Sequence, residues 1–304
     1  MPPALDSLPW LWVPLVLWAA LAQTARNAAQ RSLVARAGTL GATLSRFAWG
    51  LPFAGAWVLV LHQVAGHAVP AFGPAYFAWT AVGALTQLAA TAFLLAAMKE
   101  RNFVVGVAYS KTDVLQVALF GALLLHELPG GWTLVAMGLA SAGVLLLSLP
   151  ARSGHAGWAG SAALWGLASG ANFAIAAVAY RAAALALPGA SAWVAGGWTV
   201  LWAQLLQSLV LGAWLAWRAP GALRAMAGAW RVSTAAGAAG AAASIGWFTA
   251  YALTTAANVR TLGLVEMLFS YLVSHRLLRE KLRGAEVAGL VLLTGGLLVI
   301  LGTL

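Results

Sequence analysis

The sequence contains no cysteine and few charged residues, and each absence excludes a class of protein. Without cysteine, the 304-residue chain has no disulfide, no thiolate nucleophile and no cysteine-ligated zinc or iron-sulfur site. Only 8% of the residues are charged, 62% are hydrophobic, and the mean hydropathy is +0.86. These proportions leave too few polar side chains to cover a water-facing surface. The composition therefore predicts an integral membrane protein.

Acidic residues are the scarcer of the two charged classes. Seven aspartates and glutamates stand against 17 lysines and arginines, which gives a formal net charge of +10. In a soluble chain this excess would suggest a nucleic-acid partner. Here the basic residues fall between apolar runs rather than in a patch with interleaved aromatics, so no nucleic acid is expected. None of the five histidines has metal-ligand spacing, and no metal or cofactor is expected.

Long apolar runs dominate what is present. A bilayer core of about 30 Å needs about 20 apolar residues per helix, and the runs lack the sustained alternation of a barrel strand. The first run is longer than a signal-peptide core and has no basic flank before it, so it is expected to be a retained helix. The sequence predicts an all-α integral membrane protein with ten transmembrane helices at residues 10–33, 40–64, 75–98, 103–125, 132–149, 158–184, 192–217, 233–256, 259–278 and 285–304.

A polar break at residues 149–158 leaves five runs on either side and suggests a duplication. An odd number of helices per repeat places the two halves in opposite orientations across the membrane. We therefore predict two inverted five-helix repeats, residues 1–150 and 151–304. A single offset of 153 residues aligns two pairs of acids and two pairs of glycines, namely Asp113 with Glu266, Glu127 with Glu280, Gly131 with Gly284, and Gly143 with Gly296.

The distribution of basic residues predicts the orientation of the chain. Thirteen lysines and arginines lie in or beside one set of alternate loops, whereas the other set holds only Arg181 and Arg260, each within a few residues of a predicted helix end. Arg26 and Arg31, counted among the 13, are also compatible with the end of the first helix. Lysine and arginine accumulate on the cytoplasmic side, so both termini are expected to face away from the cytoplasm.

The fourth run carries ionisable side chains in the middle of an apolar segment. Charge at the bilayer centre costs about 2.5 kcal/mol or more, so such residues usually face a cavity or a partner. Tyr109, Thr112, Asp113 and Gln116 lie within one arc of about 100° on a helix. Lys111 points away from this stripe. Either the helix is interrupted here, or Lys111 meets an acid such as Glu266 on a neighbouring helix; a purely structural ion pair is the alternative to a functional site.

Further polar faces occur on four other predicted helices, and their convergence would form one polar pocket near the midplane. The alternatives are a role at the lipid interface for the arginines and ordinary helix packing for the small and hydroxyl residues. These faces hold Gln23, Arg26, Asn27 and Gln30 in the first helix, Gln87 and Thr91 in the third, Ser244, Trp247 and Tyr251 in the eighth, and Gly263, Glu266, Ser270 and Ser274 in the ninth. With Arg46 of the second helix added, the candidate substrate-binding or coupling residues are Asp113, Glu266, Lys111, Arg46, Gln23, Asn27, Gln87, Tyr109, Gln116, Trp247 and Tyr251.

Four segments resemble a known transporter family. They are "ALFGALLLHELPGGWTLVAMGLASAGVLLL" and "LVSHRLLREKLRGAEVAGLVLLTGGLLVI", which end the two halves, with "SRFAWGLPF" and "ALWGLASGANF". Nearly the whole chain resembles the EamA-type branch of the drug/metabolite transporter superfamily. The resemblance implies ten helices in two halves with a cavity between them. It also implies transport, often export, of amino acids, nucleotide-like compounds, sugars or amphiphilic drugs. Many ten-helix members look N-inside and C-inside, which the charge distribution here opposes.

Together these features predict a secondary carrier that moves a small polar or zwitterionic metabolite across the cytoplasmic membrane by alternating access. Asp113 and Glu266 are expected to accept protons or bind a cationic group of the substrate. Arg46 or Lys111 would then bind a substrate carboxylate. The alternatives are a membrane-embedded enzyme acting on a lipid-linked substrate, an exporter of amphiphilic drugs and a non-transporting membrane subunit. An enzyme would need a cluster of polar residues near the interface, which the dispersed residues here do not suggest. The expected partners are the substrate and membrane lipid, with the chain a monomer or homodimer.

Overall fold

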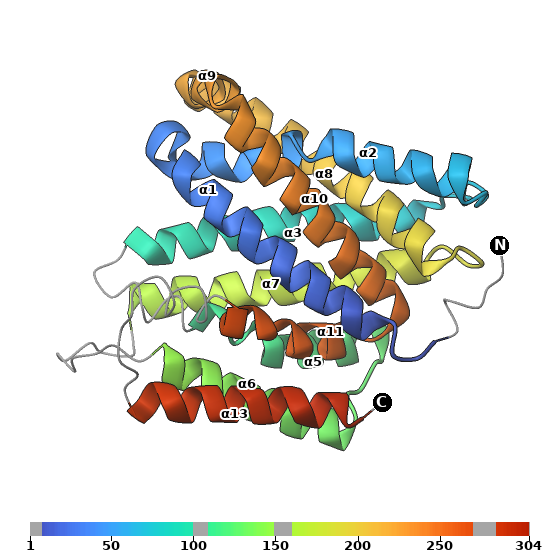
Figure 1. The fold of residues 1–304 in the computed structure, drawn as a ribbon, viewed down its shortest axis with the longest axis vertical. Helices are drawn as coiled ribbons and strands as arrows, with labels where there is room; N and C mark the ends of the chain where they lie inside the picture. Colours follow the sequence, from blue (N-terminus) through green and yellow to red (C-terminus); the bar gives the residue numbers. More distant parts are fainter. Residues whose placement is uncertain (1–7, 100–108, 149–159, 270–283, 304) are drawn as a thin grey trace. The chain divides into compact units, whose positions relative to one another are not determined.

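The structure, a computed structural model, describes residues 8–99, 109–148, 160–269 and 284–303 (Figure 1). Within these ranges every regular element is helical and no strand occurs, as predicted. The elements are α1 (Trp12–Ala48), α2 (Leu51–Leu59), the π-helix η1 (Val60–Val64), α3 (Pro74–Lys99), α5 (Asp113–Leu125), α6 (Gly131–Leu147), α7 (Ser161–Leu185), α8 (Ala192–Arg218), α9 (Pro220–Gly228), α10 (Trp230–Leu253), α11 (Ala256–Gly263) and α13 (Gly284–Leu301).

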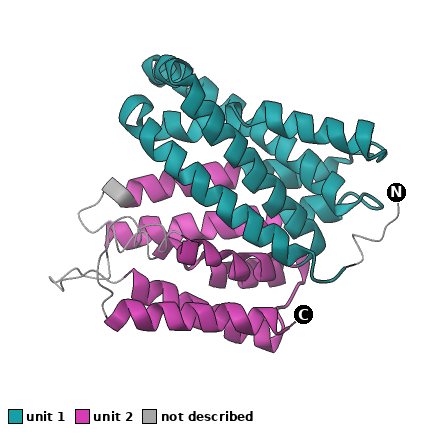
Figure 2. Cartoon of the chain, in the orientation of Figure 1, with its two compact units in different colours: residues 1–84, 180–254 teal, residues 85–179, 255–304 magenta. Residues whose placement is uncertain are grey.

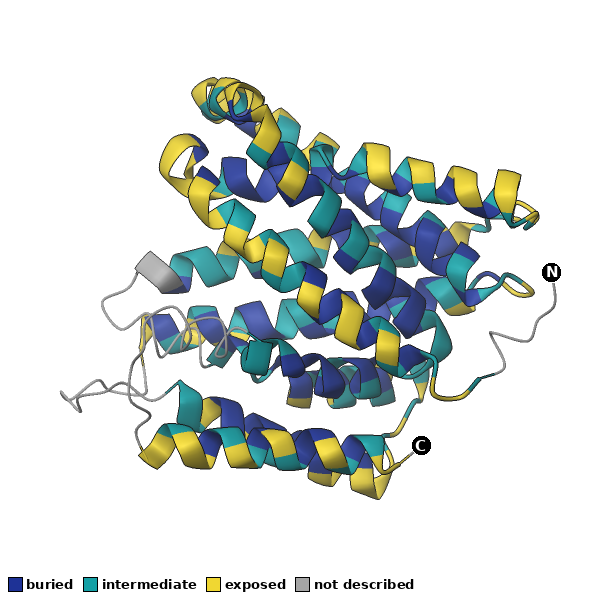
Figure 3. Ribbon diagram, viewed as in Figure 1, coloured by how far each residue is buried: buried dark blue, intermediate teal, exposed yellow. Residues whose placement is uncertain are grey.

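Five helical stretches are long and apolar enough to cross a membrane: Trp12–Val64, Pro74–Ala97, Ser161–Leu185, Ala192–Arg218 and Gly284–Leu301. Helices α5 and α6 are apolar but shorter. Many large apolar side chains on these helices face outward, which suits contact with lipid rather than with water (Figure 3). The structure is consistent with the predicted multi-pass, all-α membrane protein, and the number of ten spans stays a prediction.

The loop expected between the first two apolar runs is helical almost throughout. Helix α1 continues from Trp12 to Ala48 and is broken only at Gly38, whose φ of 68° and ψ of 173° suit glycine and few other residues. Figure 1 shows the chain turning back at this point. Alanine and arginine favour helix, and so Arg31 and Arg36 lie in the helix rather than in a loop.

The expected loop between the seventh and eighth runs contains an additional helix. Helix α9 begins with Pro220, a residue that suits the first turn because its missing N–H has no helical partner there. It packs against α1 and α8. The Ser233 hydroxyl at the start of α10 donates a hydrogen bond to the Met226 carbonyl at 2.9 Å, and this bond fixes the junction.

The chain forms two compact units, each of which combines helices from both halves of the sequence (Figure 2). Unit 1 comprises residues 1–84 and 180–254, and unit 2 comprises residues 85–179 and 255–304. The boundaries fall within α3, within α7 and between α10 and α11. The predicted division at residue 150 concerns sequence repeats rather than compact units, and it stays a prediction.

Unit 1 is organised around close contacts at small residues. Helix α1 packs against α10, where a Cβ at Gly237 would lie 2.4 Å from the Trp49 carbonyl carbon. Helix α2 packs against α8 at two further glycines. A Cβ at Gly50 would lie 2.8 Å from Gln204 Oε1, and one at Gly197 would lie 3.1 Å from the Trp57 ring. Such contacts bring helices close together in membranes.

Unit 2 contains the same kind of contact between α6 and α13. A Cβ at Gly143 would lie 2.5 Å from the Leu293 nitrogen and 2.6 Å from the Gly289 carbonyl oxygen. A Cβ at Gly296 would lie 2.7 Å from both the carbonyl oxygen of residue 136 and the nitrogen of residue 140. The earlier part of α6 therefore faces the later part of α13, and the two helices are antiparallel.

Candidate functional site

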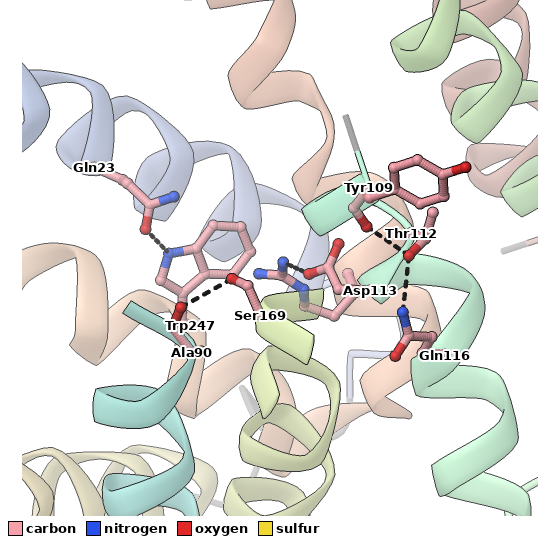
Figure 4. A network of polar contacts seen from close by, with 9 residues as sticks. Gln23, Ala90, Tyr109, Thr112, Asp113, Gln116, Ser169 and Trp247 are labelled. Atoms are coloured by element: carbon pink, nitrogen blue, oxygen red, sulfur yellow. Dashed lines mark hydrogen bonds and ion pairs between the residues drawn. The ribbon is translucent and has the colours of Figure 1, made fainter. Parts of the chain in front are cut away.

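The most deeply buried charge in the described chain is the carboxylate of Asp113, the first residue of α5. Its side chain is 1% exposed, and its Oδ2 forms an ion pair with Nη2 of Arg260 from α11 (Figure 4). The Arg260 side chain is 23% exposed. The sequence placed Asp113 at the site but assigned Arg260 to a loop. That assignment is wrong, because α11 carries Arg260 against α5.

The ion pair leaves hydrogen-bonding capacity unused on both partners. Asp113 Oδ1 and Arg260 Nε are each buried, and neither has a hydrogen-bond partner within the described residues. Glu266, which follows α11, lies close enough to Arg260 to interact with it electrostatically. Two acids that the sequence singled out thus act on one guanidinium, whereas the pairing of Lys111 with Glu266 stays a prediction.

The chain before Asp113 is interrupted in the way that one of the two alternatives anticipated. Lys111 and Thr112 form a turn between a helical segment that ends at Ser110 and the start of α5. The Thr112 hydroxyl donates to the Tyr109 carbonyl at 2.6 Å and accepts a hydrogen bond from Gln116 Nε2 at 2.8 Å (Figure 4). The predicted polar stripe is therefore linked by hydrogen bonds, and Lys111 is half-buried in the turn.

Helix α7 packs closely against this turn. A Cβ at Gly170 would lie 3.0 Å from Gln116 Nε2 and from the Ser110 carbonyl oxygen, and 3.3 Å from the Asp113 nitrogen. In the same helix the Ser169 hydroxyl donates to the Ala90 carbonyl of α3 at 2.9 Å. The polar turn is thus enclosed by neighbouring helices rather than exposed at a helix end.

Helix α11 is short and is held by hydrogen bonds at its first turn. The Thr255 hydroxyl accepts a hydrogen bond from the Asn258 nitrogen at 3.3 Å and caps the first turn. The Asn258 side-chain oxygen also accepts from the Thr133 hydroxyl of α6 at 3.3 Å. The helix ends at Gly263, and helical structure resumes after a turn at Leu264. The continuous ninth helix expected from residue 259 is therefore interrupted.

Unit 1 contains a second polar face, on α1 and α10. Trp247 Nε1 donates to Gln23 Oε1 at 3.2 Å, so the structure brings together two of the predicted residues (Figure 4). Arg26 donates to Asn27 Oδ1 through Nη2 at 2.8 Å and through Nε at 3.2 Å. The Asn27 side chain is exposed. This face therefore combines a buried tryptophan and a half-buried glutamine with an arginine–asparagine pair nearer the surface.

Arg46 lies in the second arm of α1, beyond the break at Gly38. Its guanidinium carbon is 4.3 Å from the centroid of the Phe47 ring. Its Nε and Nη2 atoms are buried and have no hydrogen-bond partner within the described residues. Arg46 is thus a half-buried side chain whose guanidinium has two shielded nitrogens and contacts an aromatic face.

The remaining candidates have mainly structural contacts. Tyr251 is buried in α10, and its carbonyl accepts a hydrogen bond from Arg181 Nη1 at 3.0 Å. The same Arg181 atom donates to the Ala252 carbonyl at 3.0 Å. Arg181, expected in a loop, instead lies in α7 and satisfies carbonyls at the end of α10. Gln87 is half-buried in α3, where its carbonyl accepts from the Thr91 hydroxyl at 3.0 Å.

The candidate residues divide between the two units. Unit 1 holds Arg46, Gln23, Asn27, Trp247 and Tyr251; unit 2 holds Asp113, Glu266, Lys111, Gln87, Tyr109 and Gln116. Ser270, Ser274 and Glu280 lie outside the described residues. The convergence of all the polar faces into one pocket stays a prediction.

Comparison with known proteins identifies a similar fold but no matching family. No family model and no curated protein matches the sequence. Solved structures do match. One protein known from a crystal structure superposes with a TM-score of 0.68 over 95% of both chains, at 18% sequence identity. At that level of identity, the likeness shows the fold alone.

Proposed function

We propose that the protein is a secondary carrier that moves a small polar or zwitterionic metabolite across the cytoplasmic membrane by alternating access. The observation that supports this proposal is the Asp113–Arg260 pair, which is buried among apolar helices and incompletely hydrogen-bonded. Ionisable residues within membrane helices commonly mark ion and substrate pathways. Both partners also lie beside helix interruptions, the usual backbone feature of carrier binding sites.

A purely structural role would not explain the Asp113–Arg260 ion pair well. Burying an ion pair costs desolvation free energy, and its replacement by apolar residues is often neutral or stabilising. Here the cost is increased because one oxygen and one nitrogen have no partner within the described residues. A proton or a charged substrate group can supply the missing contact in one state of a transport cycle. The pair thereby couples the charge of the cargo to conformation.

An inverted-repeat architecture is supported by the packing of α6 against α13. The offset of 153 residues places Ala136 on Gly289 and Ala140 on Leu293. Gly143 contacts Gly289 and Leu293, whereas its repeat equivalent, Gly296, contacts Ala136 and Ala140. Each contact therefore has an equivalent in which the two repeats exchange roles, as two-fold symmetry requires. Because the helices are antiparallel, this local axis is perpendicular to them.

Helices α2 and α8 show the same reciprocity at an offset of 147 residues. Gly50 contacts Gln204, and their equivalents Gly197 and Trp57 contact each other. Two-fold contacts thus occur in both units, each between a helix of the first half and a helix of the second. Ten membrane helices in two repeats, residues 1–150 and 151–304, account for both patterns. This arrangement agrees with the EamA-type resemblance and with alternating access.

Transport is tested directly in reconstituted vesicles. Purified protein is placed in liposomes and offered an equimolar mixture of the common amino acids and small carboxylic acids, and the compounds retained inside are identified by mass spectrometry. We expect at least one compound to accumulate above protein-free vesicles. Asp113→Asn should abolish accumulation driven by a pH gradient while leaving exchange partly intact, because the amide keeps the shape of the side chain.

Stability is measured on the same preparations to separate mechanism from scaffold. If the pair merely holds helices together, Asp113→Asn strands the charge of Arg260 and should cost about 3–5 kcal/mol. The Asp113→Asn/Arg260→Gln double variant should then recover much of the lost stability. A transport role predicts small changes in melting temperature and loss of coupled flux in both variants. An Asp113→Asn protein that transports at the normal rate would contradict the proposed role of the pair.

A further inference from the structure

The Arg46 guanidinium has two buried nitrogens, and the described residues of unit 1 offer it no acidic partner. Residues 8–84 and 180–254, the described part of this unit, contain no aspartate or glutamate. The Arg46 Nε and Nη2 atoms are shielded from water and make no hydrogen bond within the described residues. The contact with the Phe47 ring compensates only part of the charge, because a single aromatic face contributes far less than a carboxylate.

A second arginine increases the local positive charge. Arg26 lies close enough to Arg46 for the two like charges to interact electrostatically. Both side chains border Gly240 of α10, where a Cβ would lie 3.3 Å from Arg46 Cβ and 3.5 Å from Arg26 Cδ. The two arms of α1 thus bring two guanidinium groups to the same part of α10. Such a cluster is unfavourable in an apolar environment unless an anion joins it.

Neutral groups around the cluster suit a polar ligand. Trp247 and Gln23 are hydrogen-bonded on the adjoining faces of α10 and α1. The buried hydroxyl of Tyr180 lies near enough to interact electrostatically with Arg46, and Gln207 Nε2 donates to it at 3.5 Å. None of these groups carries a negative charge. The described residues of unit 1 therefore supply no counter-ion for Arg46.

We infer that Arg46, assisted by Arg26, binds a carboxylate or phosphate group of the transported substrate. A planar guanidinium offers parallel N–H donors that match two oxygens of such a group, and Nε with Nη2 forms one such pair. This inference rests on the proposed carrier function, whose conformational cycle gives a soluble anion access to the buried nitrogens. It narrows the substrate class to small metabolites that carry an oxyanion.

The inference is tested by binding, without any transport measurement. Purified protein in a maltoside detergent is melted in low-chloride buffer with increasing sodium acetate or sodium phosphate, with sodium chloride at equal ionic strength as the reference. We expect at least one of the two oxyanions to raise the melting temperature of the wild-type protein above the chloride reference. Arg46→Gln should bind that anion about tenfold or more weakly, the expected effect of losing a charged hydrogen-bond donor.

A matched control removes the same charge elsewhere in unit 1. Arg224 is exposed on α9, and Arg224→Gln should keep the full oxyanion response. In buffer without oxyanion, Arg46→Gln should melt at the wild-type temperature or above it, because an uncompensated buried cation has been removed. A structural role for Arg46 predicts a lower melting temperature instead.

Each outcome either supports or overturns the inference. An oxyanion response that survives in Arg46→Gln, or one lost equally in Arg224→Gln, would overturn it. A parallel melting experiment with phosphatidylglycerol in place of the soluble anions shows whether the bound oxyanion belongs to a lipid headgroup. If only the lipid raises the melting temperature, then Arg46 binds a headgroup and the substrate assignment is wrong. Oxyanion binding without flux in vesicles would support the anion site at Arg46 and contradict the carrier function.

Discussion

Adding one methyl group at Gly143 should separate α6 from α13. In the structure, a Cβ at this position would lie 2.5 Å from the Leu293 nitrogen and 2.6 Å from the Gly289 carbonyl oxygen. Both contacts are with backbone, which cannot rotate away as a flexible side chain can. Favourable contacts of carbon lie at about 3.5–4.0 Å, so the two helices must move apart by about 1 Å.

The expected loss of stability follows from this geometry. Overpacking a well-packed interior typically costs about 1–3 kcal/mol, and backbone contacts place Gly143→Ala near the upper end. Glycine to alanine in an unobstructed helix instead gains about 0.8–1 kcal/mol. Gly138 in the same helix and Gly295 in α13 have open space where a Cβ would be. Gly143→Ala should therefore be less stable than Gly138→Ala by about 2–4 kcal/mol.

Thermal unfolding in detergent measures this difference, which should exceed about 5 °C in melting temperature. Gly296→Ala should lose as much stability as Gly143→Ala, since a Cβ at Gly296 would lie 2.7 Å from backbone atoms of α6. The double variant should lose less than the sum, because the first methyl already separates the helices. If Gly143→Ala has the same melting temperature as Gly138→Ala, the close approach of α6 and α13 is wrong.

Three further outcomes test other parts of the structure. Gly38→Ala should lose about 1–3 kcal/mol, because few residues other than glycine adopt its backbone angles, and Gly55→Ala, which meets open space, should not. Arg181→Met should lower the melting temperature by removing two hydrogen bonds to the end of α10. The control variant Arg224→Met should keep the wild-type melting temperature. Alkaline phosphatase fused after residue 304 should be active; a fluorescent fusion that is bright in the cytoplasm would reverse the predicted orientation.

The helical fold was predictable because it depends on local properties of the sequence. Run length and the lack of alternation identify helices without knowledge of their neighbours. The repeat alignment, which stays a prediction, used an offset of 153 residues that also pairs Gly131 with Gly284. The same offset related Gly143 to Gly296, which the structure places at equivalent points of the α6–α13 contact.

The partner of Asp113 was not predictable in the same way. The sequence shows an acid in an apolar run, but Arg260 lies 147 residues further along the chain, and only tertiary packing brings the two together. Arg260 was counted with the loop residues because the ninth helix was predicted to begin only one residue before it, at residue 259. The segment "TTAANVR" did contain a signal, since threonine before an alanine-rich stretch is typical of a helix N-cap. The boundaries of α11 follow from that cap.

The two proposed repeats have equivalent helix contacts but differ in charge, and the difference bears on how many anions the protein binds. The offset of 147 residues that relates Gly50 to Gly197 also relates Arg46 to Trp193, which contacts Trp57 edge to face. The second repeat therefore has an aromatic side chain where the first has a cation. Backbone packing at glycine requires the same small residue in both repeats, whereas a charged side chain is required only where a ligand binds. If Arg46 holds the substrate oxyanion, the asymmetry predicts one anion per chain, and titration calorimetry that gave two equivalent sites would contradict it.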